Sequence, residues 1–160
     1  MRQFNVLLLC TGNTCRSPMA EGILRAFLIE KGIDHIIVSS AGINAMVGFG
    51  PSQFAVEAAK AWGIDISAHR ARQIDIRLIE KSDLILAMAP EHVFYVQKIA
   101  PAAAGKTYML RGFPKPFSPS QEKVADPMGG ELEEYNHTFL ELDEILRRLE
   151  YKILEISTLE

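Results

Sequence analysis

One stretch near the N-terminus decides the fold, Asn5-Val6-Leu7-Leu8-Leu9-Cys10-Thr11-Gly12-Asn13-Thr14-Cys15-Arg16-Ser17-Pro18. Its first part, residues 5–9, is short and apolar and precedes a Gly-containing turn, which is typical of a buried β-strand. Ser17 followed by Pro18 predicts a helix with Ser17 as its N-cap, because proline is tolerated at the first helical position. The stretch therefore predicts a strand, a tight turn and a helix in immediate succession.

The same alternation continues along the chain. Apolar runs predict three further strands, at residues 36–39, 84–87 and 107–110. Apolar residues at helical spacing predict helices from Pro18 to Gly32, at 51–62, at 75–81, from Pro90 onward and from Glu131 to about Leu154. Because strands that alternate with helices are joined by crossovers, we expect an α/β fold: one domain with a four-stranded parallel sheet and helices on both faces.

Length, composition and charge exclude several classes of protein. A chain of 160 residues predicts a single domain over residues 1–160, and 48% hydrophobic with 23% charged residues is ordinary for a globular protein rather than a disordered one. The net charge of −3 offers no basic excess, so we expect no nucleic-acid partner.

Cysteine usage and hydropathy bear on the compartment. The two cysteines are too few for a disulfide framework or a four-ligand zinc site, which favours a reducing environment. The apolar run at residues 6–9 is far shorter than the core of a signal peptide, and no stretch has the length of a membrane span. We expect a cytoplasmic protein without membrane contact.

The turn after the first strand is the expected site of chemistry, because ligands of parallel sheets bind beyond the carboxyl ends of the strands. Gly12 and Asn13 tolerate the positive φ that an anion cradle of backbone N–H groups needs. Arg16 presents a planar guanidinium suited to two phosphate oxygens. The same positive field is expected to lower the pKa of Cys10, which would make it a nucleophile at the floor of a phosphate-binding loop.

Other interpretations of this segment are weaker. A lone cysteine at a strand end is usually a small buried hydrophobe, but the arginine and the Gly-Asn turn at this spacing favour chemistry. A Walker loop is excluded, since no Gly-Lys-Ser/Thr is present. The sequence shows no cluster typical of a metal site, so we expect no metal and no cofactor.

The run Cys10-Thr11-Gly12-Asn13-Thr14-Cys15-Arg16-Ser17 resembles the C-x5-R-S signature of the low-molecular-weight protein tyrosine phosphatase family. The resemblance covers the whole chain. Ser40-Ala41-Gly42 and residues 63–73 look like the family's second-strand end and middle segment, and Asp126-Pro127 looks like its general-acid motif. The Pro-rich segment at 111–125 would then be the loop that delivers the acid.

The resemblance implies a role for each matching residue. The catalytic residues would be Cys10 as nucleophile, Arg16 as phosphoryl binder and Asp126 as general acid and base. Phosphate binding would involve the remaining residues of the loop: Thr11, Gly12, Asn13, Thr14, Cys15 and Ser17. Within this set, Asn13 would hold the loop shape and Ser17 would donate to the Cys10 thiolate. Cys15 would be a plain loop residue or the partner of Cys10 in a protective disulfide, and His69 would support the loop from behind or be solvated.

Two features bear on the substrate, which the resemblance implies is a phosphorylated protein. Thr14 stands where tyrosine-directed members typically have an aliphatic residue, and the run Asp126-Pro127-Met128-Gly129-Gly130 lacks the aromatic wall of those members. Both features resemble the protein-arginine phosphatase branch, although that branch commonly has phenylalanine at the place of Met128. Phosphoarginine is therefore favoured, and phosphotyrosine remains a competing substrate.

The walls of the pocket stay open at this stage. Residues 44–50 are expected to form one wall, with Met46 or Phe49 facing the substrate. Phe113 or Phe117 would either close over the pocket or pack in the core.

Three alternatives come from other classes. A thioredoxin-coupled arsenate reductase needs two cysteines downstream, and the chain has none after Cys15. A phosphocysteine carrier typically lacks the arginine and the acid. A non-catalytic phosphate-binding module would need neither a thiolate nor an acid. The apolar end of the last helix (Ile153, Leu154, Ile156) is compatible with a monomer or a weak homodimer.

Overall fold

A computed structural model describes residues 2–159. The elements follow in the order β1 (Phe4–Cys10), α1 (Arg16–Glu30), β2 (Ile36–Gly42), α2 (Gln53–Lys60), α3 (Ile76–Lys81), β3 (Leu84–Ala87), α4 (Pro90–Ile99), the 3₁₀ helix η1 (Pro101–Lys106), β4 (Thr107–Met109) and α5 (Leu132–Ser157). The four strands form one parallel sheet in the order β2-β1-β3-β4. The expected α/β architecture is confirmed.

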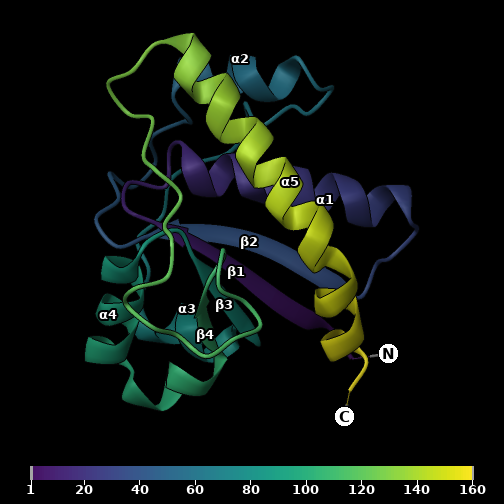
Figure 1. Cartoon of the computed structure of the whole chain (residues 1–160), viewed down its shortest axis with the longest axis vertical. Coiled ribbons are helices and arrows are strands. Elements are labelled where there is room, and N and C mark those ends of the chain that lie inside the picture. The colour runs from purple at the N-terminus through teal and green to yellow at the C-terminus, as the bar shows by residue number, and fades with distance from the viewer. Residues whose placement is uncertain (1, 160) are drawn as a thin grey trace.

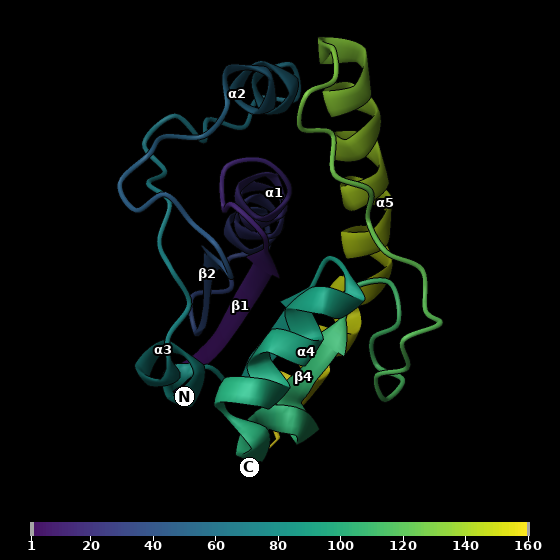
Figure 2. The same ribbon diagram turned by 90° about the vertical axis from the view of Figure 1, so that its left-hand side faces the viewer.

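Helices cover both faces of this sheet (Figures 1 and 2). Along β1 the side chains alternate: Val6 and Leu8 join the apolar core beneath α1, α2 and α5, whereas Leu7 and Leu9 join the core beneath α3 and α4. A central strand that is apolar on both faces is what a doubly covered parallel sheet requires. The sequence expectation of helices on both faces is therefore confirmed.

Three strand ends meet at one edge of the sheet, because all strands run in the same direction. The loop 11–15 follows β1, α4 begins directly beyond β3, and the long segment 110–131 follows β4. At this edge β1 and β2 pair Cys10 with Gly42. A Cβ at Gly42 would lie 2.4 Å from the carbonyl oxygen of Thr11, so only glycine allows the loop to come this close to β2.

Several boundaries differ from the sequence expectation. The first helix begins at Arg16 with Cys15 as N-cap, so Ser17 lies inside the helix and the expected Ser17 N-cap is wrong. The reason is that its hydroxyl contacts the Cys10 sulfur at 2.8 Å. At the second strand, pairing with β1 extends three residues beyond Ser39.

The apolar end of α5 lies against its own domain. Ile153 is buried, and Leu154 and Ile156 pack against the core, so these residues do not form the free apolar surface that the sequence left for self-association. Among residues 2–159, no helix is both long and apolar enough to cross a membrane.

Candidate active site

The carbonyl oxygens of the loop after β1 point outward, into hydrogen bonds with neighbouring segments. The partners are Ile43 N–H on Cys10 O (3.0 Å), Asn44 N–H on Thr11 O (2.9 Å), His69 Nε2 on Asn13 O (2.8 Å) and Ser52 N–H on Thr14 O (3.0 Å). On the inner side, the N–H groups of Asn13 and Ser17 face the Cys10 sulfur. The loop is thus a concave cradle of backbone donors around a thiol, an arrangement suited to an anion.

Asn13 sets the shape of the cradle. It is fully buried and has a φ of 59°, in the left-handed region. Its Nδ2 donates to the hydroxyls of Ser17 (2.8 Å) and Ser40 (3.0 Å), and its Oδ1 accepts from the N–H of Arg72 at 2.9 Å. The expected positive φ is therefore found at Asn13 but not at Gly12. These three bonds hold the left-handed turn, since asparagine is among the few side chains that tolerate it.

The hydroxyl of Ser17 is oriented by its neighbours. Because its oxygen accepts a hydrogen bond from Asn13, its own proton is available for the Cys10 sulfur 2.8 Å away. A donor at this distance favours the thiolate over the thiol.

Burial nevertheless raises the pKa of the Cys10 thiol above its ordinary value. The Ser17 hydroxyl, the charge of Arg16 and the N–H groups of Ser17 and Asn13 act in the opposite direction, in that order of strength. The sequence expectation of a lowered pKa is wrong in direction, because the loop removes Cys10 from water more effectively than its donors stabilise the charge. Only 2% of Cys10 is exposed.

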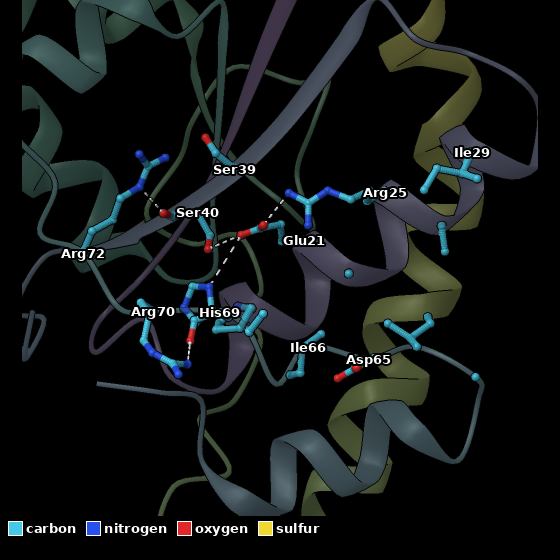
Figure 3. Close-up of a pocket in the computed structure, with 16 residues that line it drawn as sticks. Glu21, Arg25, Ile29, Ser39, Ser40, Asp65, Ile66, His69, Arg70 and Arg72 are labelled. Atoms are coloured by element: carbon cyan, nitrogen blue, oxygen red, sulfur yellow. Dashed lines mark hydrogen bonds and ion pairs between the residues drawn. The ribbon is translucent and has the colours of Figure 1, made fainter. Parts of the chain in front are cut away.

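Behind the loop lies a recess of about 580 Å³ between α1, β2 and residues 63–72 (Figure 3). Glu21 contacts several residues of this recess: its carboxylate accepts a hydrogen bond from Ser40 at 2.6 Å and pairs with Arg25 at 2.5 Å. The His69 ring lies between this carboxylate, 4.0 Å from its Nδ1, and the Asn13 carbonyl. Of the two expectations for His69, support of the loop from behind is the one that the geometry favours.

Arg16 lies at the junction of the loop and the long segment after β4. It is 4% exposed, and its Nη1 donates to the carbonyl of Val124 at 2.9 Å. Its Nη2 lies 3.4 Å from Thr11 Oγ1 and 3.5 Å from Asp126 Oδ2. Arg16 therefore links the loop to the carboxylate of Asp126.

The segment before Asp126 is anchored at Val124. The Val124 N–H donates to the Met88 carbonyl at 2.8 Å, and its carbonyl accepts from Arg16. Asp126 follows two residues later with its side chain 42% exposed, and its Oδ1 accepts from the Met128 N–H at 3.1 Å. The carboxylate thus reaches the mouth of the cradle from a segment far away in the sequence.

His92 is a buried residue at the site that the sequence analysis did not identify. It lies in the first turn of α4, with no exposed surface, and its Nε2 is 2.9 Å from Thr11 Oγ1. Burial and the charge of Arg16 lower its pKa to about 4. The available signal was its position, since a histidine just beyond the third strand falls at the sheet edge where ligands bind.

Cys15 and Cys10 are both buried and are not joined by a disulfide. The Cys15 sulfur lies 3.4 Å from Ser52 Oγ and 3.6 Å from the hydroxyl of Tyr135. Burial, together with the contact to Cys15, raises the pKa of Tyr135 to about 12, so its hydroxyl keeps its proton. Cys15 therefore faces the interior between α2 and α5.

The residues that the sequence offered as pocket walls differ in their burial. Met46, Phe49 and Met128 are more than half exposed. Phe113 and Phe117 instead pack edge-to-face on Tyr108 and Phe94, with ring centroids 4.9 and 5.4 Å apart. Of the two expectations for these phenylalanines, packing is the one found. Within residues 2–159, no three His, Cys, Asp or Glu side chains group in a way that fits a metal ion.

Comparisons with known proteins agree with this geometry. Residues 5–157 match the family described as low molecular weight phosphotyrosine protein phosphatase. A putative low molecular weight protein-tyrosine-phosphatase of Klebsiella pneumoniae is 39% identical over 75% of this chain and 84% of its own. A protein-arginine-phosphatase of Geobacillus stearothermophilus is 35% identical over 94% of this chain and 96% of its own.

Solved structures extend the comparison to the fold. The YwlE arginine phosphatase from Geobacillus stearothermophilus superposes with a TM-score of 0.84 at 35% identity, covering 95% of this chain and 94% of that one. A low molecular weight protein tyrosine phosphatase from T. tengcongensis gives a TM-score of 0.85 at 40% identity, covering 94% and 99%. The chain therefore belongs to the low molecular weight protein tyrosine phosphatase family and is a cysteine-dependent protein phosphatase.

Proposed function

We propose that this phosphatase hydrolyses phosphoarginine on proteins through a phosphocysteine intermediate, with Cys10, Arg16 and Asp126 as its catalytic residues. The observation that carries the substrate is Thr14. Its side chain is half-buried in the cradle loop, and the hydrogen bond recorded for its hydroxyl is a weak one to the Cys15 sulfur at 3.8 Å. That hydroxyl is available to a polar leaving group such as a guanidinium, and a phenol ring would gain nothing from it.

Two further observations support this substrate. Met128 and Gly129 follow Asp126-Pro127, so no aromatic ring stands there to stack on a phosphotyrosine. The relative from Geobacillus stearothermophilus named protein-arginine-phosphatase matches nearly the whole chain.

In the first step, the Cys10 thiolate attacks the phosphorus held by Arg16 and the loop N–H groups. The P–S bond forms while the P–N bond to the arginine side chain breaks, and protonated Asp126 gives its proton to the leaving nitrogen. The hydroxyl of Ser17, 2.8 Å from the sulfur, stabilises the thiolate before the attack.

In the second step, a water molecule attacks the phosphorus of the phosphocysteine. The Asp126 carboxylate takes the water proton, the P–S bond breaks and its electron pair returns to Cys10. Inorganic phosphate then leaves. Asp126 is placed for both roles because it lies at the partly exposed mouth of the cradle, 3.5 Å from the arginine that would bind the phosphoryl group.

The test is phosphate release from two matched peptides, one carrying phosphoarginine and one phosphotyrosine. We expect wild type to prefer the phosphoarginine peptide and Thr14→Ile to reduce that preference by about tenfold, the value of one pocket contact. Cys10→Ser is expected to lose turnover on both peptides by about 10⁴-fold or more.

The opposite outcomes are equally informative. A phosphotyrosine preference that Thr14→Ile leaves unchanged would reject phosphoarginine as the substrate and assign specificity to the exposed rim around Met46 and Phe49. Phosphate release by Cys10→Ser at the wild-type rate would reject the phosphocysteine intermediate. A matched control is Thr158→Ile, which replaces an exposed threonine at the far end of α5 and leaves both rates unchanged.

A further inference from the structure

His92 contacts the cradle from α4, which begins just beyond β3, and not from the signature loop. It is fully buried at the start of α4, and the contact joins its Nε2 to Thr11 Oγ1 at 2.9 Å. Thr11 directly follows Cys10, so this is the point where α4 touches the phosphate-binding loop. Thr11 was expected to bind phosphate as part of the loop, but none of the roles assigned above uses His92 or its contact with the Thr11 hydroxyl.

The direction of the hydrogen bond follows from the other ring nitrogen. His92 Nδ1 accepts from the backbone N–H of Ala89 at 3.0 Å, at the N-terminus of α4. An acceptor nitrogen carries no proton, so the neutral ring has its proton on Nε2. His92 therefore donates to Thr11. The ring is neutral at physiological pH because its pKa is lowered to about 4.

The Thr11 hydroxyl receives a second donor. Arg16 Nη2 lies 3.4 Å from the same oxygen. A hydroxyl that accepts from two donors has one proton left, directed away from both of them. An anion oxygen bound by Arg16 would lie beside Thr11 Oγ1 and would accept that proton.

We propose that His92 is a positioning residue that orients the Thr11 hydroxyl as a donor to the bound phosphoryl group and holds Arg16 beside it. The proposal rests on the proposed function only in that the cradle binds a phosphoryl group, and it holds for an arginine or a tyrosine substrate alike. Thr11 is thereby a side-chain ligand of the phosphoryl group in addition to the backbone cradle.

The two nitrogens of His92 make its roles separable. In asparagine, the side-chain amide ends near the place of Nδ1, so His92→Asn can still accept from Ala89 but does not reach Thr11. In glutamine, the amide extends to the place of Nε2, so His92→Gln can still donate to Thr11. A role limited to capping α4 would thus be preserved by asparagine, and a role toward Thr11 by glutamine.

The test measures binding of inorganic phosphate to Cys10→Ser protein by calorimetric titration, which needs no turnover. We expect His92→Asn and Thr11→Val each to weaken phosphate binding by about tenfold, the loss of one hydrogen bond to a charged group. His92→Gln and Thr11→Ser are expected to stay within about twofold of the parent. The double variant with His92→Asn and Thr11→Val is expected to be no weaker than Thr11→Val alone, since both changes remove the same donor.

The second readout is turnover of p-nitrophenyl phosphate, measured on proteins that keep the native Cys10. We expect KM and the inhibition constant of phosphate to rise in His92→Asn and Thr11→Val, and His92→Gln to restore them. The control is His35→Asn. This change breaks another contact between a histidine ring and a hydroxyl, from His35 Nε2 to Ser157 Oγ at 2.8 Å, at the opposite end of the sheet. It is expected to change the melting temperature but not phosphate binding.

Three results would overturn the proposal. The first is unchanged phosphate binding in Thr11→Val, a variant that leaves His92 and its cap intact. The second is strictly additive losses in the double variant. The third is weak phosphate binding in both His92→Gln and Thr11→Ser at unchanged melting temperature. Failure of the substrate assignment is seen separately, in the peptide preference, and leaves these phosphate measurements untouched.

Discussion

The two halves of the active site are held in different ways. The loop from Cys10 to Ser17 is buried at its centre, with Asn13 at 0% exposure. Partners from three other segments, residues 40–44, Ser52 and residues 69–72, hold its carbonyls and its asparagine amide. The segment after β4 carries Asp126 with a side chain 42% exposed, and its anchors near the site are the two backbone bonds of Val124.

Further from the site, Arg111 ties the same segment to the domain. Its guanidinium pairs with Glu141 on α5 and, at 3.3 Å, with Glu122. Phe113 and Phe117 also pack inward, and most of the rest of the segment runs along the surface (Figure 1).

The difference reflects what each half must do. A nucleophile and its anion cradle gain from a fixed geometry, because donors that are already oriented need no rearrangement during the reaction. A general acid has to meet leaving groups of varied shape and then a water molecule. Changes in the two halves should therefore separate: the acid side should lose rate without stability, and the loop side should lose both.

Asp126→Asn should have the largest effect. With the proton donor removed, we expect kcat/KM, which reports the step that releases the leaving group, to fall by about 10²–10⁴-fold on phenyl phosphate and by much less on p-nitrophenyl phosphate, whose leaving group needs little protonation. The melting temperature should stay within about 1 °C of wild type, since an exposed carboxylate contributes little to stability.

A matched control is Glu133→Gln, an exposed carboxylate on α5 that lines the same recess as Asp126. It should leave both rates unchanged. Equal losses on the two esters in Asp126→Asn would show that Asp126 is not the acid, and a large fall in melting temperature would break the contrast between the two halves.

Asn13→Ala should have the next largest effect and should act on both properties. It removes the bonds to Ser17, Ser40 and the Arg72 N–H, and it places alanine at a φ of 59°. We expect a loss of about 3 kcal/mol in the free energy of unfolding and about 100-fold in kcat/KM, measured by urea denaturation and by p-nitrophenyl phosphate turnover.

Asn136→Ala, on the exposed face of α5, is the control and should change neither quantity by much. If Asn13→Ala lost activity at full stability, the network behind the loop would not be what holds the cradle. If it lost stability at full activity, the cradle would tolerate a different loop shape.

The sequence predicted much of this architecture because its signals are local. The Gly-Asn turn, the apolar run before it and the alternation of strands and helices each follow from neighbouring residues, and the sheet and its two covered faces were confirmed. Ser17 was misjudged as an N-cap because its partner, the Cys10 sulfur, is reached only once the loop has folded back.

The rest depends on contacts between distant segments. Burial raises the pKa of Cys10, and no spacing of loop residues reveals how far β2 and α1 exclude water from it. The link of His92 to Thr11 joins residues 81 positions apart, through the pairing of β1 with β3. Contacts of this kind depend on the topology of the sheet, so a single sequence predicts the elements but not which distant side chains meet.

The smallest expected effect concerns the stability of the loop half of the active site at acidic pH. His92 has a pKa of about 4 in the folded protein against an ordinary 6.5, because burial and Arg16 disfavour its charge more than Glu91 and Asp126 favour it. The unfolded chain thus binds a proton at His92 below about pH 6.5, and the native one only below about pH 4. The contribution of neutral His92 to the free energy of unfolding is fully present above pH 6.5 and is lost as the pH drops toward 4. The loss is roughly 2 to 3 kcal/mol between pH 7 and 4.5.

Urea denaturation at both pH values should show that much extra loss in wild type relative to His92→Gln, which has no proton to take up. An equal loss in both proteins would mean that His92 is not buried as a neutral ring, and that the loop side owes its acid sensitivity to other groups.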